Sequence, residues 1–234
     1  MYNAGRGGSV RRLFPHSENN CRLMLVKLKI AVWKMLGIVD MLPMKWKGVR
    51  FGKGCFVDGK PYVRMAKGAE IILGNDVTLV SRMHHNPLVR HRMIMNALTP
   101  SAVIELGDHV GVSGCSLVCC NSITVGEYTI IGPDTLLYDS EGHHYSPETG
   151  WRIRTIRSGR PITIGKKCFI GARCIILSGV TIGDNCVVAA GTVVSQDIPA
   201  GHRASGNPAT YEPLPKLLGG PGRRKAPVDT PPSN

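Results

Sequence analysis

Five of the eight histidines of this 234-residue chain lie in two short segments that also contain arginine and proline. Residues 81–101 read SRMHHNPLVRHRMIMNALTPS, and residues 138–161 read YDSEGHHYSPETGWRIRTIRSGRP. An imidazole has an ordinary pKa of about 6.5, so it can accept a proton at neutral pH and act as a general base. Three imidazoles that converge on one point could instead bind zinc. Both segments are therefore candidate functional segments.

The two segments interrupt a six-residue repeat, which must position them. From Ile164 to Val194 an aliphatic residue recurs at every sixth position. This period fits neither a helix nor a long alternating strand, and it is typical of short strands joined by turns. Three such units close a triangular coil of about 18 residues, and stacked coils form a parallel β-solenoid. Earlier runs of the repeat contain Phe51, Val57, Val63, Leu73, Leu79, Leu106, Val112, Val118, Val125, Ile131 and Leu137.

Glycine often follows the repeated aliphatic residue, as in Gly165, Gly171 and Gly183. Glycine at this place suits a tight corner that needs a positive φ or a close approach between backbones. Free cysteine behaves as a small buried hydrophobe, and four of the eight cysteines lie two residues before a repeated aliphatic residue. No CxxC pair is present, which argues against zinc. We therefore predict packing roles for Cys55, Cys168, Cys174 and Cys186.

The formal charge of +13 is concentrated toward the ends of the chain. Residues 1–50 carry 10 basic and 2 acidic side chains, whereas residues 51–211 carry 15 and 12. A nearly neutral repeat region without interleaved aromatic and basic residues argues against nucleic-acid binding. We predict four parts: a disordered basic N-terminus over 1–22, an apolar basic helix over 23–48, the repeat domain over 49–211 and a disordered Pro/Gly-rich tail over 212–234.

The most apolar stretch, over residues 23–42, contains Lys27, Lys29, Lys34 and Asp40, and these charges argue against a helix that crosses a bilayer. Two alternatives stay open. The helix could cap the repeat domain or pack on a neighbouring subunit, or it could lie on a membrane surface with its lysines at anionic headgroups. No cleavable signal peptide is recognised, so we expect a cytoplasmic protein, with the inner face of the membrane as a further possibility.

Taken together, these features resemble the hexapeptide-repeat acyltransferases. The resemblance covers about residues 50–210 and is carried by ITIGKKCFIGARCIILSGVTIGDNCVVAAGTVVSQDIPAG, by the closing ASGNPA and by DSEGH. The most similar branch is that of the polysaccharide and surface-glycan O-acetyltransferases. The resemblance implies a mainly β fold: a left-handed parallel β-helix with an N-terminal helix and two inserted loops. It also implies acetyl-CoA as acyl donor, no metal, a sugar or glycan acceptor and a homotrimer.

In that branch the histidine that closes the motif is the general base, and here this residue is His143. The base takes the proton of a sugar hydroxyl as the hydroxyl attacks the thioester carbonyl. Asp139 is the first candidate for a carboxylate that fixes the imidazole tautomer, and Glu141 is the second. The family usually has Asp where this chain has Glu141, and the adjacent His144 is an alternative base.

The resemblance also implies that coenzyme A lies along the later coils, with Ala172 and Ala190 at its pantetheine arm. Many relatives place tryptophan where this chain has Phe169. Ser195 and Gln196 replace a frequent Thr-Lys pair near the nucleotide, so the usual phosphate contact is in doubt. Arg173 or Arg203 could replace that contact.

On the acceptor side, galactoside and maltose acetyltransferases bind sugar partly through an Asn and an Asp. Ser113 and Cys120 stand approximately there, which argues against those two specificities. We expect the 81–101 insertion to help form the acceptor site through His84, His85 and Asn86. The alternative for this insertion is a surface loop that packs between subunits.

Other functions of the same fold stay open. The acceptor could be an amine, giving N-acetylation, or a small serine-type hydroxyl. A zinc carbonic anhydrase would need three histidines that face one subunit gap, but the repeat does not continue through His85 and His91, and Pro87 lies between them. A non-catalytic scaffold is disfavoured by the histidine of DSEGH.

Overall fold

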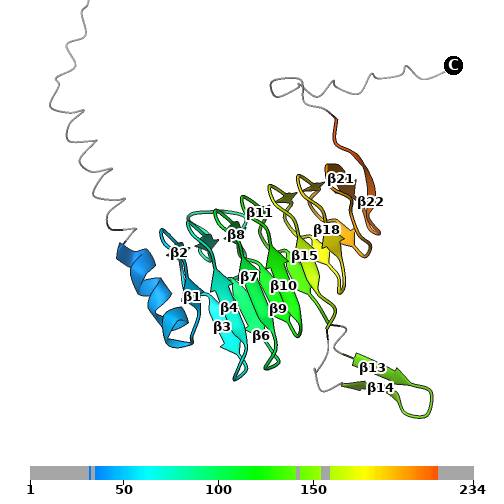
Figure 1. The fold of residues 1–234 in the computed structure, drawn as a ribbon, viewed down its shortest axis with the longest axis horizontal. Helices are drawn as coiled ribbons and strands as arrows, with labels where there is room; N and C mark the ends of the chain where they lie inside the picture. The colour runs from blue at the N-terminus through cyan, green and yellow to red at the C-terminus, as the bar shows by residue number, and fades with distance from the viewer. Residues whose placement is uncertain (1–31, 33–34, 141–142, 154–158, 216–234) are drawn as a thin grey trace, which may run out of the picture.

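The computed structural model describes residues 32, 35–140, 143–153 and 159–215. In these residues three parallel sheets enclose one core, and each coil of the chain adds one strand to each sheet (Figure 1). Sheet A contains β1 (Arg50–Phe51), β4 (Glu70–Leu73), β7 (Val103–Leu106), β10 (Ser122–Val125), β15 (Ile162–Ile164) and β18 (Thr181–Ile182). The mainly β, left-handed parallel β-helix that the resemblance implies is confirmed.

Sheets B and C complete the triangle. Sheet B contains β2 (Phe56–Asp58), β5 (Thr78–Val80), β8 (Gly111–Ser113), β11 (Ile130–Ile131), β16 (Phe169–Ile170), β19 (Val187–Val188), β21 (His202–Ser205) and β22 (Thr210–Pro213). Sheet C contains β3 (Tyr62–Met65), β6 (Ile94–Ala97), β9 (Ser116–Cys119), β12 (Leu136–Tyr138), β17 (Ile175–Ile176) and β20 (Val193–Val194). The antiparallel pair β21–β22 ends the described solenoid.

The repeated aliphatic residues form columns along the core. Leu106, Val125, Ile164 and Ile182 are register partners on successive coils, and each is at most 1% exposed. A six-residue period therefore returns each aliphatic side chain to the same place on the next coil. The stack buries small and branched aliphatic side chains, which explains why so few aromatic residues suffice.

The glycines after the aliphatic residues are explained by the close approach of neighbouring coils, and not by a positive φ. A Cβ on Gly126 would lie 2.6 Å from the carbonyl carbon of Gly165, which holds the equivalent place on the next coil. Positive φ occurs two residues later in the same corners, as at Tyr128 (59°) and Lys167 (56°). The corner therefore needs glycine where coils touch, and it tolerates larger residues where the backbone turns.

The cysteine slot is buried at Cys168, Cys174 and Cys186 and half-buried at Cys55, and it also links the coils. Sγ of Cys168 donates a hydrogen bond to the carbonyl of Gly183 (3.1 Å), and Sγ of Cys174 donates to that of Ala189 (3.1 Å). Thr129 fills the slot one coil earlier and donates to the carbonyl of Gly165 (2.8 Å). The slot therefore favours a small side chain that can donate a hydrogen bond.

Two details of the predicted repeat are wrong. The first interruption is shorter than 81–101, because residues 94–97 form β6 and bury Met95 and Ala97 in the core. Val118 was expected to point inward, but Leu117 does so instead. The corner before β9 is one residue shorter than the others and turns at Gly114 (φ 51°). The inward-facing position therefore moves one residue toward the N-terminus in β9, before the point at which the sequence spacing changes.

A helix over residues 35–46 lies at the N-terminal end of the solenoid (Figure 1). It buries Gly37, Asp40, Met41 and Met44 against the first coil. Most of the predicted 23–34 part of this helix, the predicted disordered N-terminus over 1–22 and most of the predicted tail lie outside the described residues. Among the described helical residues, no stretch is long and apolar enough to span a membrane.

The close approach of neighbouring coils predicts unequal effects of two glycine substitutions. Gly126→Ala places a Cβ against backbone atoms and is expected to lower the free energy of unfolding by about 1–3 kcal/mol. In Gly111→Ala the nearest heavy atom to the new Cβ is 3.8 Å away, so the change should stay within about 1 kcal/mol. Urea denaturation of both variants tests this, and equal effects would contradict it.

Candidate functional site

A groove of about 400 Å³ runs along the corner between sheets B and C on the later coils. Small residues form its floor, which keeps the backbone accessible. The lining residues are Leu88, Pro133, Ala172, Arg173, Ala190 and Gly191. The groove therefore brings together Ala172 and Ala190, two of the residues predicted to contact the cofactor.

Backbone geometry holds the groove open. Arg173 follows Ala172 with a φ of 58°, and Gly191 follows Ala190 with a φ of 75°. The amide of Gly191 donates to the carbonyl of Ala172 (2.9 Å), so the two corners stack directly. The Arg173 guanidinium is largely exposed and lies 4.0 Å from the Asp134 carboxylate. A narrow apolar floor with one cation beside it fits an extended ligand that carries an anionic group.

The loop between β5 and β6, residues 81–93, supplies the remaining wall of the groove. Val89 is buried against Gly114, whose Cβ position lies 2.9 Å from the Val89 side chain. The amide of Arg90 donates to Asp134 Oδ1 (3.3 Å), and the amide of Leu88 donates to Asn86 Oδ1 (3.1 Å). These contacts fix the loop over the B/C corner of the early coils and place Leu88 in the groove.

The other end of this loop meets the first coil. His85 Nδ1 lies 2.7 Å from Asp58 Oδ2, and Arg82 lies 3.5 Å from Asp58 Oδ1. Asp58, His84 and His85 place possible ligand atoms within 4.8 Å of one another, a grouping that could hold a metal ion. Because Arg82 and His85 already meet the carboxylate, we assign no metal here.

Histidines 85 and 91, considered above as zinc ligands, contact different acids. His91 Nε2 lies 3.5 Å from Asp134 at the groove, whereas His85 contacts Asp58 at the first coil. The loop therefore spans the corner between two separate contacts. This arrangement gives no support to a carbonic anhydrase site formed by this pair.

Asp139 anchors the base of the second insertion. It is fully buried, and its two carboxylate oxygens accept hydrogen bonds from the amides of Cys120 and Asn121 (both 2.7 Å). Its carbonyl accepts from the amide of Arg160 (2.8 Å) and from Ser178 Oγ (2.8 Å). Burial raises the pKa of the Asp139 carboxyl, and the hydrogen bonds from the Asn121 and Cys120 amides oppose that rise.

His143 begins a hairpin that leaves the solenoid (Figure 1). Strand β13 (His143–Ser146) pairs antiparallel with β14 (Gly150–Ile153), and His143 is the register partner of Ile153. The His143 side chain is exposed. Glu141 lies outside the described residues. Among the described contacts no hydrogen bond joins Asp139 to His143, so the contacts of Asp139 support an anchoring role.

The remaining predicted residues lie elsewhere. Phe169 is 50% exposed on the outer side of sheet B, beside Ile130 and Val187. Ser195 and Gln196 follow β20 at the corner between sheets C and A, where Gln196 Nε2 donates to the carbonyl of Ala209 (3.2 Å). In this chain none of the three lines the groove. Ser113 ends β8 at the B/C corner of an earlier coil.

Sheet C separates the groove from the His143 hairpin within one chain. Pro133 lines the groove just before β12, and the second insertion leaves directly after β12. The chain between the two corners is extended over about five residues, which corresponds to roughly 15 Å. A single copy therefore keeps the candidate base apart from the groove.

Comparison with known proteins agrees with this architecture. Residues 161–196 match the family described as the hexapeptide repeat of succinyl-transferase. The match agrees with the six-residue repeat seen in the sequence and in the stacked coils. The chain is 41% identical to nodulation protein L of Rhizobium meliloti (strain 1021) over 107 residues, which cover 45% of this chain and 57% of that protein. It is 37% identical to the galactoside O-acetyltransferase of Escherichia coli (strain K12) over 89 residues, which cover 37% of this chain and 41% of that protein.

The chain thus spans about half the length of the curated relatives it matches. Among solved structures, this chain is similar to a mutant of AntD, an N-acyltransferase from Bacillus cereus, in complex with dTDP and coenzyme A. The TM-score is 0.56 at 18% identity, over 74% of this chain and 88% of that one. This likeness shows the fold alone.

Sequence reasoning missed several residues of the site. Leu88, Pro133 and Gly191 line the groove, but none carries a chemical group that a motif would reveal. Asp58 precedes a corner glycine and is paired with His85 only because the loop folds back over the first coil. Gly191 follows Ala190 directly, and this Ala-Gly pair was the available signal.

Because Asp139 is buried and accepts two amide hydrogen bonds, its removal should destabilise the protein more than removal of an exposed carboxylate. Asp139→Ala leaves the amides of Cys120 and Asn121 without acceptors and is expected to lower the free energy of unfolding by about 2–4 kcal/mol. Asp184 is the matched control, because it is exposed and accepts one amide hydrogen bond from Lys166 (2.8 Å). Thermal or urea denaturation should show a clearly smaller loss for Asp184→Ala.

Proposed function

We propose that this hexapeptide-repeat protein transfers an acetyl group from acetyl-CoA to a hydroxyl of a sugar, with a unit of a surface or extracellular polysaccharide as acceptor. The groove lined by Ala172 and Ala190 is the observation that carries the proposal. The likeness to a galactoside O-acetyltransferase supports the reaction class. Amine acceptors remain an outcome of the acceptor assays below.

On the donor side, the groove suits the pantetheine arm of coenzyme A. That arm is long, narrow and rich in amide groups, so it needs backbone access and little side-chain bulk. Alanine and glycine at the three sites Ala172, Ala190 and Gly191 leave that access. The exposed Arg173 beside the groove is the candidate contact for a phosphate of the cofactor.

On the acceptor side, His143 is the candidate general base. A sugar hydroxyl is a weak nucleophile until its proton is removed as it attacks the thioester carbonyl. The imidazole of His143 accepts that proton, and the thiolate of coenzyme A leaves as the acetyl–oxygen bond forms. His143 is exposed at the start of β13, and the hairpin of β13 and β14 leaves the solenoid (Figure 1), so another chain can meet it there.

The separation of groove and hairpin implies a site built from two copies. Each copy would supply its groove to one neighbour and its hairpin to the other, which is the arrangement that cyclic symmetry produces. We take sheet C of the later coils, around the exposed Ile175, as the contact face, because the groove and the hairpin lie at the two ends of its strands. We expect a homotrimer.

Loss of the base predicts loss of turnover. His143→Ala is expected to lower kcat for acetyl transfer by about 10²–10⁴-fold, because the attacking hydroxyl keeps its proton. KM for acetyl-CoA should change little, since the groove is intact. The measurement is thiol release from acetyl-CoA with a panel of sugars and amino sugars. His202→Ala is the control, because His202 lies on β21 at the end of the solenoid. Undiminished turnover in His143→Ala would refute this mechanism.

A complementation experiment tests the shared site. Ala190→Tyr fills the groove and should abolish activity, as His143→Ala does, yet mixed assemblies of the two inactive variants contain some sites with both an intact groove and an intact base. Co-expression should therefore restore a measurable fraction of activity. Lys167→Tyr is the size control, because Tyr128 holds the equivalent corner position one coil earlier. No recovery in verified mixed assemblies would place both residues in one chain's site.

A further inference from the structure

The N-terminal helix presents an apolar outer face that no described residue covers. Trp46 is 84% exposed, Met35 63%, Ile38 60% and Val39 51%. Leu36 and Leu42 are exposed on the same helix. A helix that only capped the solenoid would carry polar residues on this side. An exposed apolar face of this size on a short helix indicates an interaction surface.

The inner face of the same helix is fixed, so rotation cannot hide the apolar residues. Gly37 packs closely on Phe56. A Cβ at Gly37 would lie 2.9 Å from the Phe56 ring, so the contact has room only for glycine. Asp40 is buried, accepts a hydrogen bond from the amide of Gly59 (2.8 Å) and pairs with Arg82 (3.0 Å). The buried carboxylate and its two partners set the rotation of the helix about its axis.

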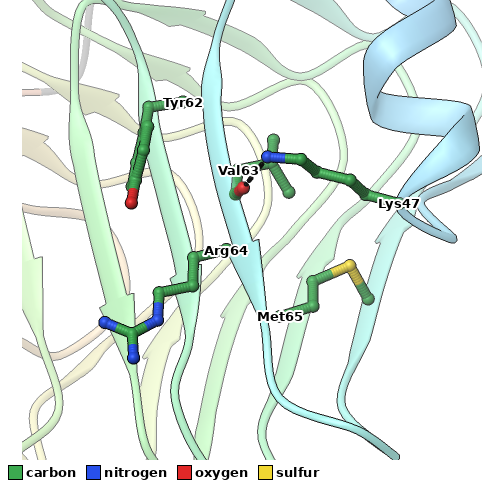
Figure 2. A pocket seen from close by; sticks show the side chains of 5 residues that line it. All are labelled: Lys47, Tyr62, Val63, Arg64 and Met65. Carbon is green, nitrogen blue, oxygen red and sulfur yellow. Dashed lines mark hydrogen bonds between the residues drawn. The ribbon is translucent and has the colours of Figure 1, made fainter.

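A cationic pocket adjoins the end of this helix. It has a volume of about 390 Å³ and is lined by Lys47, Tyr62, Val63, Arg64 and Met65 (Figure 2). Lys47 Nζ donates to the carbonyl of Val63 (2.5 Å) and lies 5.8 Å from the centre of the Tyr62 ring. Arg92 approaches the same ring at 5.2 Å. Two cations, Lys47 and Arg92, thus lie against the Tyr62 ring, and Arg64 is a third cation in the lining of the pocket.

These cations have no acidic partner in the part of the chain that the structure describes. Among the described residues, no carboxylate lies within salt-bridge distance of Lys47, Arg64 or Arg92, whereas Arg50 pairs with Glu70 (2.7 Å) and Arg82 with Asp40. Lys45, on the helix itself, lies over the Phe51 ring and likewise has no acidic partner within the described part of the chain. Unpaired cations beside an apolar face match the chemistry of an anionic lipid headgroup above acyl chains.

We propose that the helix over 35–46 and the cationic pocket together form a docking surface for a membrane containing anionic phospholipids. The helix lies in the plane of the interface, with its apolar face toward the acyl chains. Trp46, the last residue of the helix and the neighbour of Lys47, occupies the boundary region where tryptophan is favoured. Lys47, Arg64 and Arg92 then receive headgroup phosphates.

The net positive charge of this part of the chain favours an anionic membrane, and not a second copy of the chain, as the partner of the docking surface. Residues 1–50 carry 10 basic and 2 acidic side chains, and one of those acids is the buried Asp40. A contact between copies through this face would bring like charges together. An anionic membrane neutralises them and adds apolar burial at the same time.

Flotation of the full chain with vesicles tests the proposal without any need for acetyl transfer. Binding is expected to phosphatidylcholine vesicles that contain phosphatidylglycerol, and it should be much weaker to phosphatidylcholine alone. Arg64→Gln with Arg92→Gln should lower the partition coefficient about 25-fold, at about fivefold per residue. Leu42→Asp, at an exposed position, should lower it by at least about tenfold. Lys166→Gln with Lys167→Gln removes the same charge at a distant corner and should change binding by no more than about twofold.

Three results would overturn the proposal. The first is equal binding to neutral and anionic vesicles. The second is a Leu42→Asp variant that keeps its vesicle binding but loses subunits in sedimentation, since the face would then lie between copies. The third is displacement from vesicles by inorganic phosphate, matched for ionic strength, which would identify a site for a free anion. Since no assay here uses acetyl-CoA, failure of the docking surface and failure of the proposed reaction are distinguishable.

Discussion

The hydrogen bonds between stacked coils are the constraint on which the rest of the structure depends. Every coil must repeat the backbone path of the previous one, because its strands are parallel and pair with equivalent strands at a fixed register. Glycines allow the corners to touch, and thiol or hydroxyl donors such as Cys168 and Thr129 link one coil to the carbonyls of the next. Extra residues can enter only where the chain leaves this path at a corner, and both insertions do so.

The same constraint creates the groove. The loop over 81–93 leaves the solenoid at the B/C corner and covers that corner on the early coils, where Val89 packs on Gly114. In the described part of the chain nothing covers this corner on the later coils in the same way, and the corner residues there are Ala172, Ala190 and Gly191. The groove is therefore the uncovered continuation of a corner, with the end of the loop as its wall. The second insertion leaves from the opposite end of β12, so the stacking that forms the groove also separates it from His143.

The sequence was sufficient to predict the parts of the fold that depend on period alone. The columns from Ile164 to Val194, the buried cysteines and the two interruptions follow from spacing and residue size. Spacing could not locate β6 inside the first interruption, because Met95 and Ala97 do not continue a glycine-marked repeat. In the site, Ala172 and Ala190 meet because they share a corner position one coil apart. Phe169, Ser195 and Gln196 stand on other sides of the triangle, and the pairing of Asp58 with His85 depends on a loop path that no local pattern encodes.

The N-terminal end of the solenoid shows which residues folding requires and which it leaves free. Strand β3 is an edge strand of sheet C, and an uncovered edge invites unwanted pairing. The helix and the turn after it meet this need through a few groups: Asp40 accepts the amide of Gly59, and Lys47 donates to the carbonyl of Val63. These contacts, with Gly37, Met41 and Met44, are enough to cap the first coil. No described residue packs on the outer face, where a soluble cap would carry charge, yet that face holds Ile38, Val39, Leu42 and Trp46. The apolar character of this face is therefore best explained by a partner outside the chain. The neighbouring cations Lys47, Arg64 and Arg92, which have no acidic partner among the described residues, favour an anionic membrane as that partner.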